Sequence, residues 1–305
     1  MRTPVAGSDD PRVWCDPVNG LTTNDGLSQA YPVKHPQHAL DIAAYSFELI
    51  PPFVWTPSPG HDSGVVKGIK IKLMASPAGA CVFDNPLYID GLGACGPVTL
   101  EGDPANPMGT FLRANNTFQG ITAQNGARLR LQHLAIDSKE NCTLINGLRR
   151  GIIEVHEGVW LGPSFNGGKN APMGAAGASC LEIHSTVSMW GSGFWAILVA
   201  IESGQIILTT MAGFFLSNAM DYGSFLGLQR AECWTQGVPP SFTGAWAASA
   251  AAFPTSNIKF SITDVGYCSI FNALNNIPGN GYTLGTASMA YDHTGAKLPS
   301  NTSAL

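Results

Sequence analysis

Three short segments between residues 127 and 189 repeat one alternating pattern, and this repeat limits the possible folds more than any other feature of the sequence. Each segment places an apolar side chain at every second position, as a strand with one buried face does. When Leu131, Val155 and Ile183 are aligned as inward residues, the steps are 24 and 28 residues, within the range of solenoid repeats. We therefore expect each step to be one coil of a stack. The three segments are 129–136, 153–161 and 181–189.

The same step continues on both sides of the repeat. Upstream, Ile71 and Leu100 are aligned as earlier inward positions, with steps of 29 and 31 residues toward the repeat. Downstream, Leu208, Leu228 and Phe260 are aligned next, with steps of 25, 20 and 32 residues. Turn-forming residues separate these strands and no helical pattern lies between them, which argues against βαβ units.

An antiparallel sandwich remains the alternative fold, because it too contains many short strands separated by turns. The solenoid is favoured because equivalent residue types recur at equivalent positions of each step. Gly126, Gly151 and Gly204 each stand just before a strand, where a coil needs a corner and glycine is conformationally free.

The opening of the chain carries a second signature. A strand ends at Asp16-Pro17, the sequence Asn-Asp-Gly-Leu-Ser follows at 24–28, and a stretch with an apolar face runs over 36–50. This opening resembles that of right-handed parallel β-helix proteins of the pectin-lyase-like superfamily, in the form common in bacteriophage tail spikes and tail fibres. The resemblance covers the opening and, more loosely, the coils to about residue 290. It implies right-handed coils and a homotrimer.

The predicted fold is all-β, a single-stranded right-handed parallel β-helix with a short N-terminal capping helix. We expect that helix to begin at Pro36 and to end before Pro51-Pro52. Lying across the first coil, it would cover backbone that otherwise invites edge-to-edge association. We divide the chain into four regions. Residues 1–12 are an N-terminal tail, and 13–64 contain the first strand, the capping helix and a loop. The coils follow over 65–283, and 284–305 form a C-terminal extension.

Composition and charge exclude some partners. Charged residues make up 12% of the chain, against a usual share of about 25%, which suits a chain buried in an oligomer or a larger particle. The net charge of −5 offers no basic footprint for nucleic acid, and no apolar run is long enough for membrane insertion.

The N-terminus lacks the apolar core of a secretion signal. The seven cysteines are odd in number and form no Cys-x-x-Cys pair, so we expect reduced, mostly buried thiols, with intermolecular disulfides as the alternative.

The outward positions of the aligned strands bring chemically active side chains together. Arg130 on one coil is followed by Glu154 and His156 on the next, and by Glu182 and His184 on the third. Adjacent coils lie about 4.8 Å apart, so the two carboxylates should be close enough to perturb at least one carboxylate pKa. Two carboxylates and two imidazoles on one face can act as acid and base for glycoside cleavage, or can bind a divalent metal.

The alternative interpretation gives these residues no catalytic role. Each glutamate then pairs with a neighbouring histidine or with Arg130, and each exposed pair contributes less than about 1 kcal/mol. The sequence favours this ladder of ion pairs, and so a protein that is not an enzyme. The candidate catalytic residues remain Glu154, Glu182, His156 and His184, and no metal site or cofactor is predicted.

Tryptophans are the other indication of function. The alternation places Trp160 and Trp190 outward, and Trp246 in a loop predicted over 236–256. Exposed rings can bind the C–H faces of sugars, since a flat apolar ring buries area at little entropy cost. With Arg130, these three residues form the predicted ligand-binding set. Packing under loops or against a neighbouring subunit is the alternative.

These observations lead to a virion protein as the first hypothesis. As a tail spike, fibre or decoration it would adhere to bacterial surface polysaccharide and contact other virion proteins. Assembly in the host cytoplasm would account for the missing signal. The alternatives are a polysaccharide depolymerase, a hydrolase or lyase on the same scaffold, and a purely structural particle component. Fold alone does not separate them.

Overall fold

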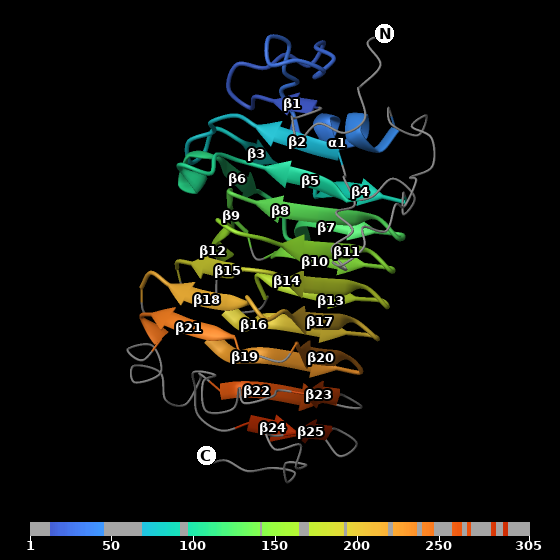
Figure 1. The fold of residues 1–305 in the computed structure, drawn as a ribbon, viewed down its shortest axis with the longest axis vertical. Coiled ribbons are helices and arrows are strands. Elements are labelled where there is room, and N and C mark those ends of the chain that lie inside the picture. Colours follow the sequence, from blue (N-terminus) through green and yellow to red (C-terminus); the bar gives the residue numbers. More distant parts are fainter. Residues whose placement is uncertain are drawn as a thin grey trace, which may run out of the picture.

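In the computed structural model the chain is an all-β, right-handed parallel β-helix with one short α-helix among the described residues, as the sequence predicts (Figure 1). No described helix is long and apolar enough to span a membrane. The structure describes residues 13–45, 69–91, 97–140, 142–164, 171–191, 194–218, 222–236, 240–246, 258–263, 267–269, 282–284 and 289–291.

The described strands form three parallel sheets, and each full coil contributes one strand to each sheet. Sheet 1 contains β1 (Val13–Cys15), β2 (Ile69–Leu73), β5 (Val98–Glu101), β8 (Arg128–Gln132), β11 (Ile152–Val155), β14 (Cys180–Ile183), β17 (Gln205–Leu208), β20 (Glu232–Thr235), β23 (Tyr267–Ser269) and β25 (Met289–Tyr291). Sheet 2 contains β3 (Val82–Phe83), β6 (Phe111–Ala114), β9 (Ala135–Ser138), β12 (Trp160–Ser164), β15 (Thr186–Met189), β18 (Gly213–Leu216) and β21 (Ser241–Gly244). Sheet 3 contains β4 (Leu87–Asp90), β7 (Gln119–Gln124), β10 (Thr143–Leu148), β13 (Met173–Ala176), β16 (Phe194–Ile201), β19 (Tyr222–Gln229), β22 (Ile258–Thr263) and β24 (Tyr282–Leu284).

The register of sheet 1 confirms the alignment of the central repeat. Val155 pairs with Leu131 on one side and with Ile183 on the other, and all three side chains are fully buried. The upstream positions are confirmed in the same way, since Leu100 pairs with both Ile71 and Leu131. In-register stacking of apolar side chains therefore builds the wall of the core on this side.

The downstream alignment is correct for one step and then wrong. Leu208 follows Ile183 as expected, but its next partner is Thr235 of β20. Leu228 belongs to sheet 3, where it pairs with Ile262 and not with Phe260. The alternation in β19 resembles that of a sheet 1 strand, so the pattern alone does not say which of the three sheets a strand joins. Beyond these strands, β24 and β25 pair with β22 and β23 and continue the sheets to Tyr291, past residue 283.

Two corners show why glycine precedes the strands of sheet 1. A Cβ added to Gly151 would stand 2.0 Å from the carbonyl oxygen of Ala123 on the coil before it, so no larger residue fits there. Gly126 instead has space around it but a φ of +87°, a conformation that side chains disfavour. The corners between sheets 3 and 1 are therefore set by close backbone approach at one coil and by backbone conformation at another.

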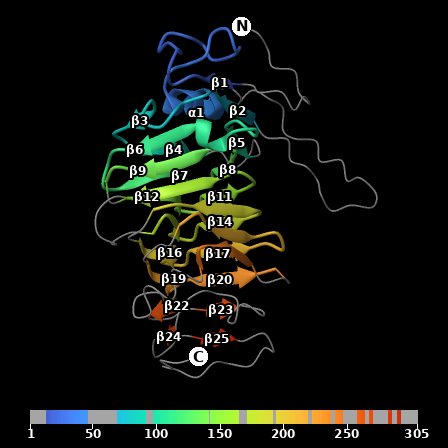
Figure 2. The same cartoon turned by 90° about the vertical axis from the view of Figure 1, so that its left-hand side faces the viewer.

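Helix α1 (Pro36–Tyr45) caps the N-terminal end of the stack, above β4 (Figure 2). It begins at Pro36 as predicted and buries Ala39 and Leu40 completely, while the expected last turn, 46–50, lies outside the described residues. The side-chain amide of Gln37 donates to the carbonyl of Tyr88 and accepts from its N–H, at 3.0 and 2.7 Å. Because β4 is the first described strand of sheet 3, this amide satisfies backbone groups of an edge strand.

The residues of the opening signature hold the first loop against β1. The Asp16 carboxylate accepts hydrogen bonds from the N–H groups of Val18 and Asn19, at 2.9 and 2.8 Å. The carbonyl of Gly26, which has a φ of +67°, accepts from the N–H of Trp14 at 2.7 Å. The residues of the opening signature therefore stabilise the first loop at the start of the stack.

Candidate functional site

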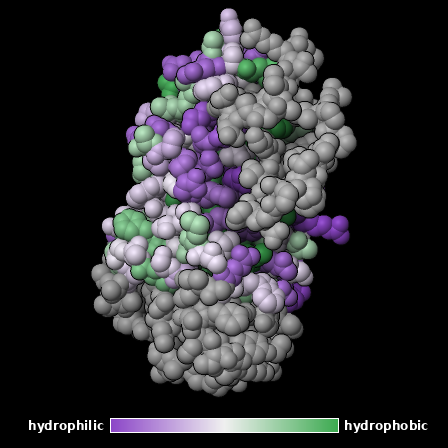
Figure 3. Space-filling model, in the orientation of Figure 1, coloured by the Kyte–Doolittle hydropathy of each residue, from purple (hydrophilic) through white to green (hydrophobic). Residues whose placement is uncertain are grey.

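From β2 to β14 the outward side chains of sheet 1 form a polar ladder, part of which appears as a hydrophilic band over β2, β5 and β8 in Figure 3. Parallel strands in register place equivalent side chains one above another. One column of the ladder runs through Lys70, Thr99, Arg130, Glu154 and Glu182. The predicted outward placement of the charged residues is confirmed, because the whole column follows from the register.

Glu154 is the most enclosed member of the ladder, with 1% of its surface exposed. One carboxylate oxygen accepts a hydrogen bond from Arg128, and the other accepts from Arg130 at 2.8 Å and lies 3.2 Å from His156 Nε2. Burial opposes the charged form, but hydrogen bonds from His156 and Arg130 and the charges of both arginines outweigh it, so the pKa lies well below its usual range. Glu154 is a fixed carboxylate in this arrangement.

Arg128 joins two coils. Its guanidinium pairs with Glu154 and lies 3.6 Å from the carboxylate of Glu182. The same oxygen of Glu182 is 2.8 Å from Nε2 of His184. The two glutamates are therefore separated by a positive charge, and the direct repulsion that would raise a carboxylate pKa is relieved.

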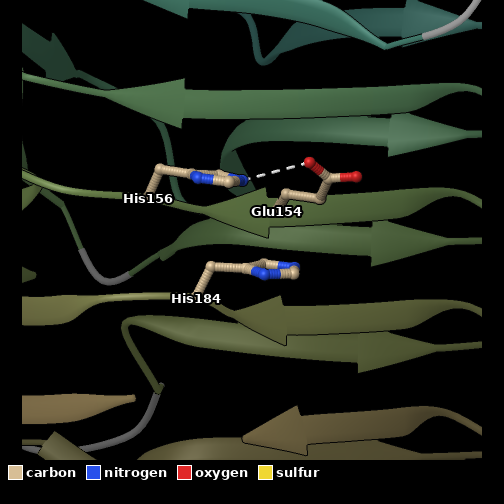
Figure 4. Close-up of side chains that lie close together, drawn as sticks. All are labelled: Glu154, His156 and His184. Carbon is tan, nitrogen blue, oxygen red and sulfur yellow. Dashed lines mark hydrogen bonds and ion pairs between the residues drawn. The ribbon is translucent and has the colours of Figure 1, made fainter. Parts of the chain in front are cut away.

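His156 and His184 stack face to face, with ring centroids 4.7 Å apart and planes 7° from parallel. Figure 4 shows both rings projecting from neighbouring coils beside Glu154. The separation equals the spacing of adjacent strands, so the stack is a direct result of the register. Glu154, His156 and His184 each offer a ligand atom, and these atoms lie within 4.8 Å of one another.

The chemistry open to this ladder differs between its two glutamates. Glu154 is charged well below neutral pH and inaccessible, so it cannot donate a proton to a substrate at neutral pH. Glu182 and His184 are partly exposed and hydrogen-bonded to each other, so they could contact a substrate as an acid–base pair must. Arg130, predicted to bind ligand, has 29% of its side chain exposed and is engaged by Glu154.

A group of aromatic rings on the outer face of sheet 2 was not predicted as a unit. We call Phe111, Trp160, Trp190 and Phe215 the sheet 2 aromatic cluster. Ring centroids are 5.7 Å apart for Phe111 and Trp190, 6.4 Å for Trp160 and Trp190, and 6.1 Å for Trp160 and Phe215. Hydrophobic side chains are visible over β18 in Figure 3. Trp160 and Trp190 lie outward as predicted, and both are half-buried.

Small residues between the rings make the cluster possible. Ser188 separates Trp160 from Phe215 in the register, and Ala135 separates Phe111 from Trp160. A Cβ added to Gly162 would stand 2.3 Å from the Trp190 ring, so this glycine lets the indole lie against the sheet. The large and small residues alternate along the column.

A charged pair borders the cluster. Arg113 donates two hydrogen bonds to Asp137, at 2.7 and 2.6 Å, and its guanidinium lies 5.4 Å from the centroid of the Phe111 ring. The pKa of Arg113 is raised, chiefly because it hydrogen-bonds the Asp137 carboxylate. The outer face of sheet 2 thus combines apolar rings with a fixed polar edge.

Trp246 corrects the prediction of an exposed sugar-binding ring. It has 4% of its surface exposed, and its indole N–H donates to the carbonyl of Phe214 at 3.1 Å. The ring packs edge to face against Phe225 and Phe242. The chain turns inward after β21, so a residue assigned to a loop lies in the core instead.

The sequence matches no protein-family model and no curated protein. Among solved structures, the chain is similar to YbhC of Escherichia coli, with 10% sequence identity and a TM-score of 0.35. The similarity covers 99% of this chain and 80% of that one. A likeness at this level carries no argument about activity, so the functional argument rests on the surfaces described above.

Proposed function

We propose that this protein is an adhesive β-helix that binds a bacterial surface polysaccharide as a component of a phage virion. The observation that supports the binding function is the sheet 2 aromatic cluster. Support for the virion setting comes from the resemblance of the opening, Asp16-Pro17 with 24–28, and from the low share of charged residues. These are independent parts of the proposal.

The cluster suits a sugar chain in shape and chemistry. Phe111, Trp160 and Phe215 share one register column of sheet 2, so the rings form a row parallel to the axis of the stack. Phe111 is buried, and the other rings of the cluster are half-buried. Sugar rings present flat C–H faces that pack on such side chains, while their hydroxyls need hydrogen-bond partners at the edge. Arg113 stands beside the rings with 26% of its side chain exposed and retains N–H groups for that purpose, while the buried Asp137 holds it in place. An extended chain lying along the axis would contact both the rings and Arg113.

Binding without cleavage is the function that this surface supports best. Asp137 is the carboxylate that borders the described rings, and both of its oxygens are occupied by Arg113. Glycoside cleavage by the common mechanisms needs two carboxyl groups, one of them protonated. With both oxygens bonded to Arg113, Asp137 is not free to serve as either of them.

The test measures binding of the purified protein to surface polysaccharides from a panel of bacteria. Trp160→Ala should weaken binding about tenfold, since one well-placed aromatic contact contributes roughly 1.4 kcal/mol. Trp234→Ala removes a tryptophan that is 39% exposed on sheet 1 and serves as the control. Equal affinity of the Trp160→Ala and Trp234→Ala variants for a polysaccharide that the wild type binds would refute the assignment to sheet 2.

A depolymerase on sheet 1 is the second candidate, and the exposed Glu182–His184 pair favours it. In this case the wild type would release reducing or unsaturated ends from the polysaccharide, and Glu182→Gln would abolish release while leaving binding intact. Glu202→Gln changes a glutamate at a corner of the same coil series and is the matched control. Binding without release would exclude cleavage of the polymers in the panel.

A further inference from the structure

We infer that Glu154, His156 and His184 form a binding site for a transition-metal ion of the zinc type, separate from the surface that binds polysaccharide. Two imidazoles and one carboxylate are a donor set that suits zinc and its neighbours, and three protein ligands leave a coordination position open for water. The ligand atoms of the three residues lie within 4.8 Å of one another, and Figure 4 shows the three side chains close together on neighbouring coils.

The fold assembles the donors without any loop. Glu154 lies in β11 and His156 follows that strand, so alternation points both side chains to the same side. Hydrogen bonds of the backbone hold the next coil in register, because His184 donates its N–H to the carbonyl of Val155 at 2.8 Å. The two rings therefore project from positions directly after two adjacent, paired strands, β11 and β14, and binding costs little ordering of the backbone.

Metal binding requires one of the two histidine rings to rotate, because stacked rings direct their lone pairs along parallel planes. Metal–ligand bonds of about 2.0–2.2 Å around a tetrahedral ion place ligand atoms about 3.4 Å apart. His156 Nε2 and the Glu154 oxygen are already 3.2 Å apart, and all the ligand atoms lie within 4.8 Å of one another. The remaining contraction involves His184, whose ring stacks on His156 and has 30% of the side chain exposed. A partly exposed ring can rotate without disturbing the core.

Three further charged groups lie next to the three proposed metal ligands: the carboxylate of Glu182 and the guanidinium groups of Arg128 and Arg130. Glu182 lies 2.8 Å from Nε2 of His184 and can orient its ring, as carboxylates do for metal-bound histidines, if His184 offers its other nitrogen, Nδ1, to the ion. Two arginines act against the metal: Arg130 occupies the Glu154 oxygen that faces His156, and Arg128 pairs with both Glu154 and Glu182. With 43% of its side chain exposed, Arg128 can move into solvent when a cation takes its place. Competition with Arg128 is thus a specific feature of this site.

The experiment titrates chelator-treated full-length protein with Zn²⁺ by calorimetry, and with Co²⁺ by visible absorption. We expect one ion per chain in this site and a Co²⁺ spectrum of nitrogen and oxygen ligation. His156→Gln and His184→Gln should each weaken Zn²⁺ binding at least tenfold, whereas Arg128→Gln should strengthen it. His35→Ala, which removes an exposed histidine before α1, is the matched control and should leave affinity unchanged.

Two results would overturn the inference. One is the absence of Zn²⁺ and Co²⁺ binding to the wild-type protein. The other is undiminished binding in a variant that carries both His156→Gln and His184→Gln, which would place the ion on other groups such as thiols. Far-UV circular dichroism of each variant checks that the coils remain folded. Because the polysaccharide assay uses sheet 2, it succeeds or fails independently of this titration.

Discussion

Replacing Glu154 by glutamine tests whether the sheet 1 ladder stabilises the fold. The substitution keeps the shape of the side chain but removes a buried charge on which Arg128, Arg130 and His156 converge. Breaking a fully buried ion pair costs about 3–5 kcal/mol, and a hydrogen bond to a charged group contributes about 1.5–3 kcal/mol. Arg128 and Arg130 have 43% and 29% of their side chains exposed and regain water in the variant. We therefore expect a loss of about 2 kcal/mol.

Urea unfolding followed by circular dichroism, in buffer with a chelator, measures this loss as a lower midpoint at unchanged slope. Glu182→Gln is the control on the next coil, where the carboxylate is more exposed, with 17% of the side chain accessible, and the cost should stay below about 1 kcal/mol. Arg130→Gln combined with Glu154→Gln should cost less than the sum of the single variants, since the two groups share an interaction. A loss for Glu154→Gln no larger than that for Glu182→Gln would refute this reasoning.

Three further predictions concern stability and the thiols. Gly151→Ala should cost more than about 3 kcal/mol in urea unfolding because of the backbone clash, whereas Gly126→Ala should cost about 1 kcal/mol; equal costs would contradict the role of close approach. Although burial raises the pKa of Glu101, hydrogen bonds from two lysines lower it overall, so this carboxylate stabilises the fold above about pH 4.3 and less as the pH falls further. The loss of stability below that pH should be smaller in Glu101→Gln, and an identical acid profile would exclude the contribution. Burial raises the pKa of Cys81 to about 12 and that of Cys142 to about 11, so iodoacetamide at pH 8 should label them slowly in the folded protein and quickly in urea, as read by mass spectrometry; fast labelling of the folded protein would contradict their burial.

The path of sheet 1 could be predicted from sequence as far as Leu208, because its inward residues up to that point are strongly apolar and its steps are similar in length. Leu131, Val155 and Ile183 fix the register, and the outward column follows from it. Sheets 2 and 3 could not be separated in the same way. Their strands show the same alternation, so Leu228 was assigned to the wrong sheet. Which sheet a strand joins depends on how tightly the chain turns at each corner, and local patterns do not encode that angle.

The candidate sites were predictable to different degrees. The stacking of His156 on His184 follows from strand spacing alone, whereas the bridge that Arg128 makes between two carboxylates depends on side-chain conformation. The sheet 2 aromatic cluster joins Phe111 to Phe215, which are far apart in the chain. Only the register of β6, β9, β12, β15 and β18 brings them together. Signals of that kind require the three-dimensional path of every coil between them.

The direction of the backbone hydrogen bonds also gives the protein a mechanical character. In all three sheets these bonds join one coil to the next, and β1 and β25 are the two ends of sheet 1. Tension between those ends would break the backbone hydrogen bonds between neighbouring coils one coil at a time. Tension along the strands, between residues on different coils, would instead load many bonds together in shear. A polymer that leaves the side of the stack in the direction of the strands would therefore load the stiffer direction of the molecule, whereas one that pulls along the axis would load the weaker direction.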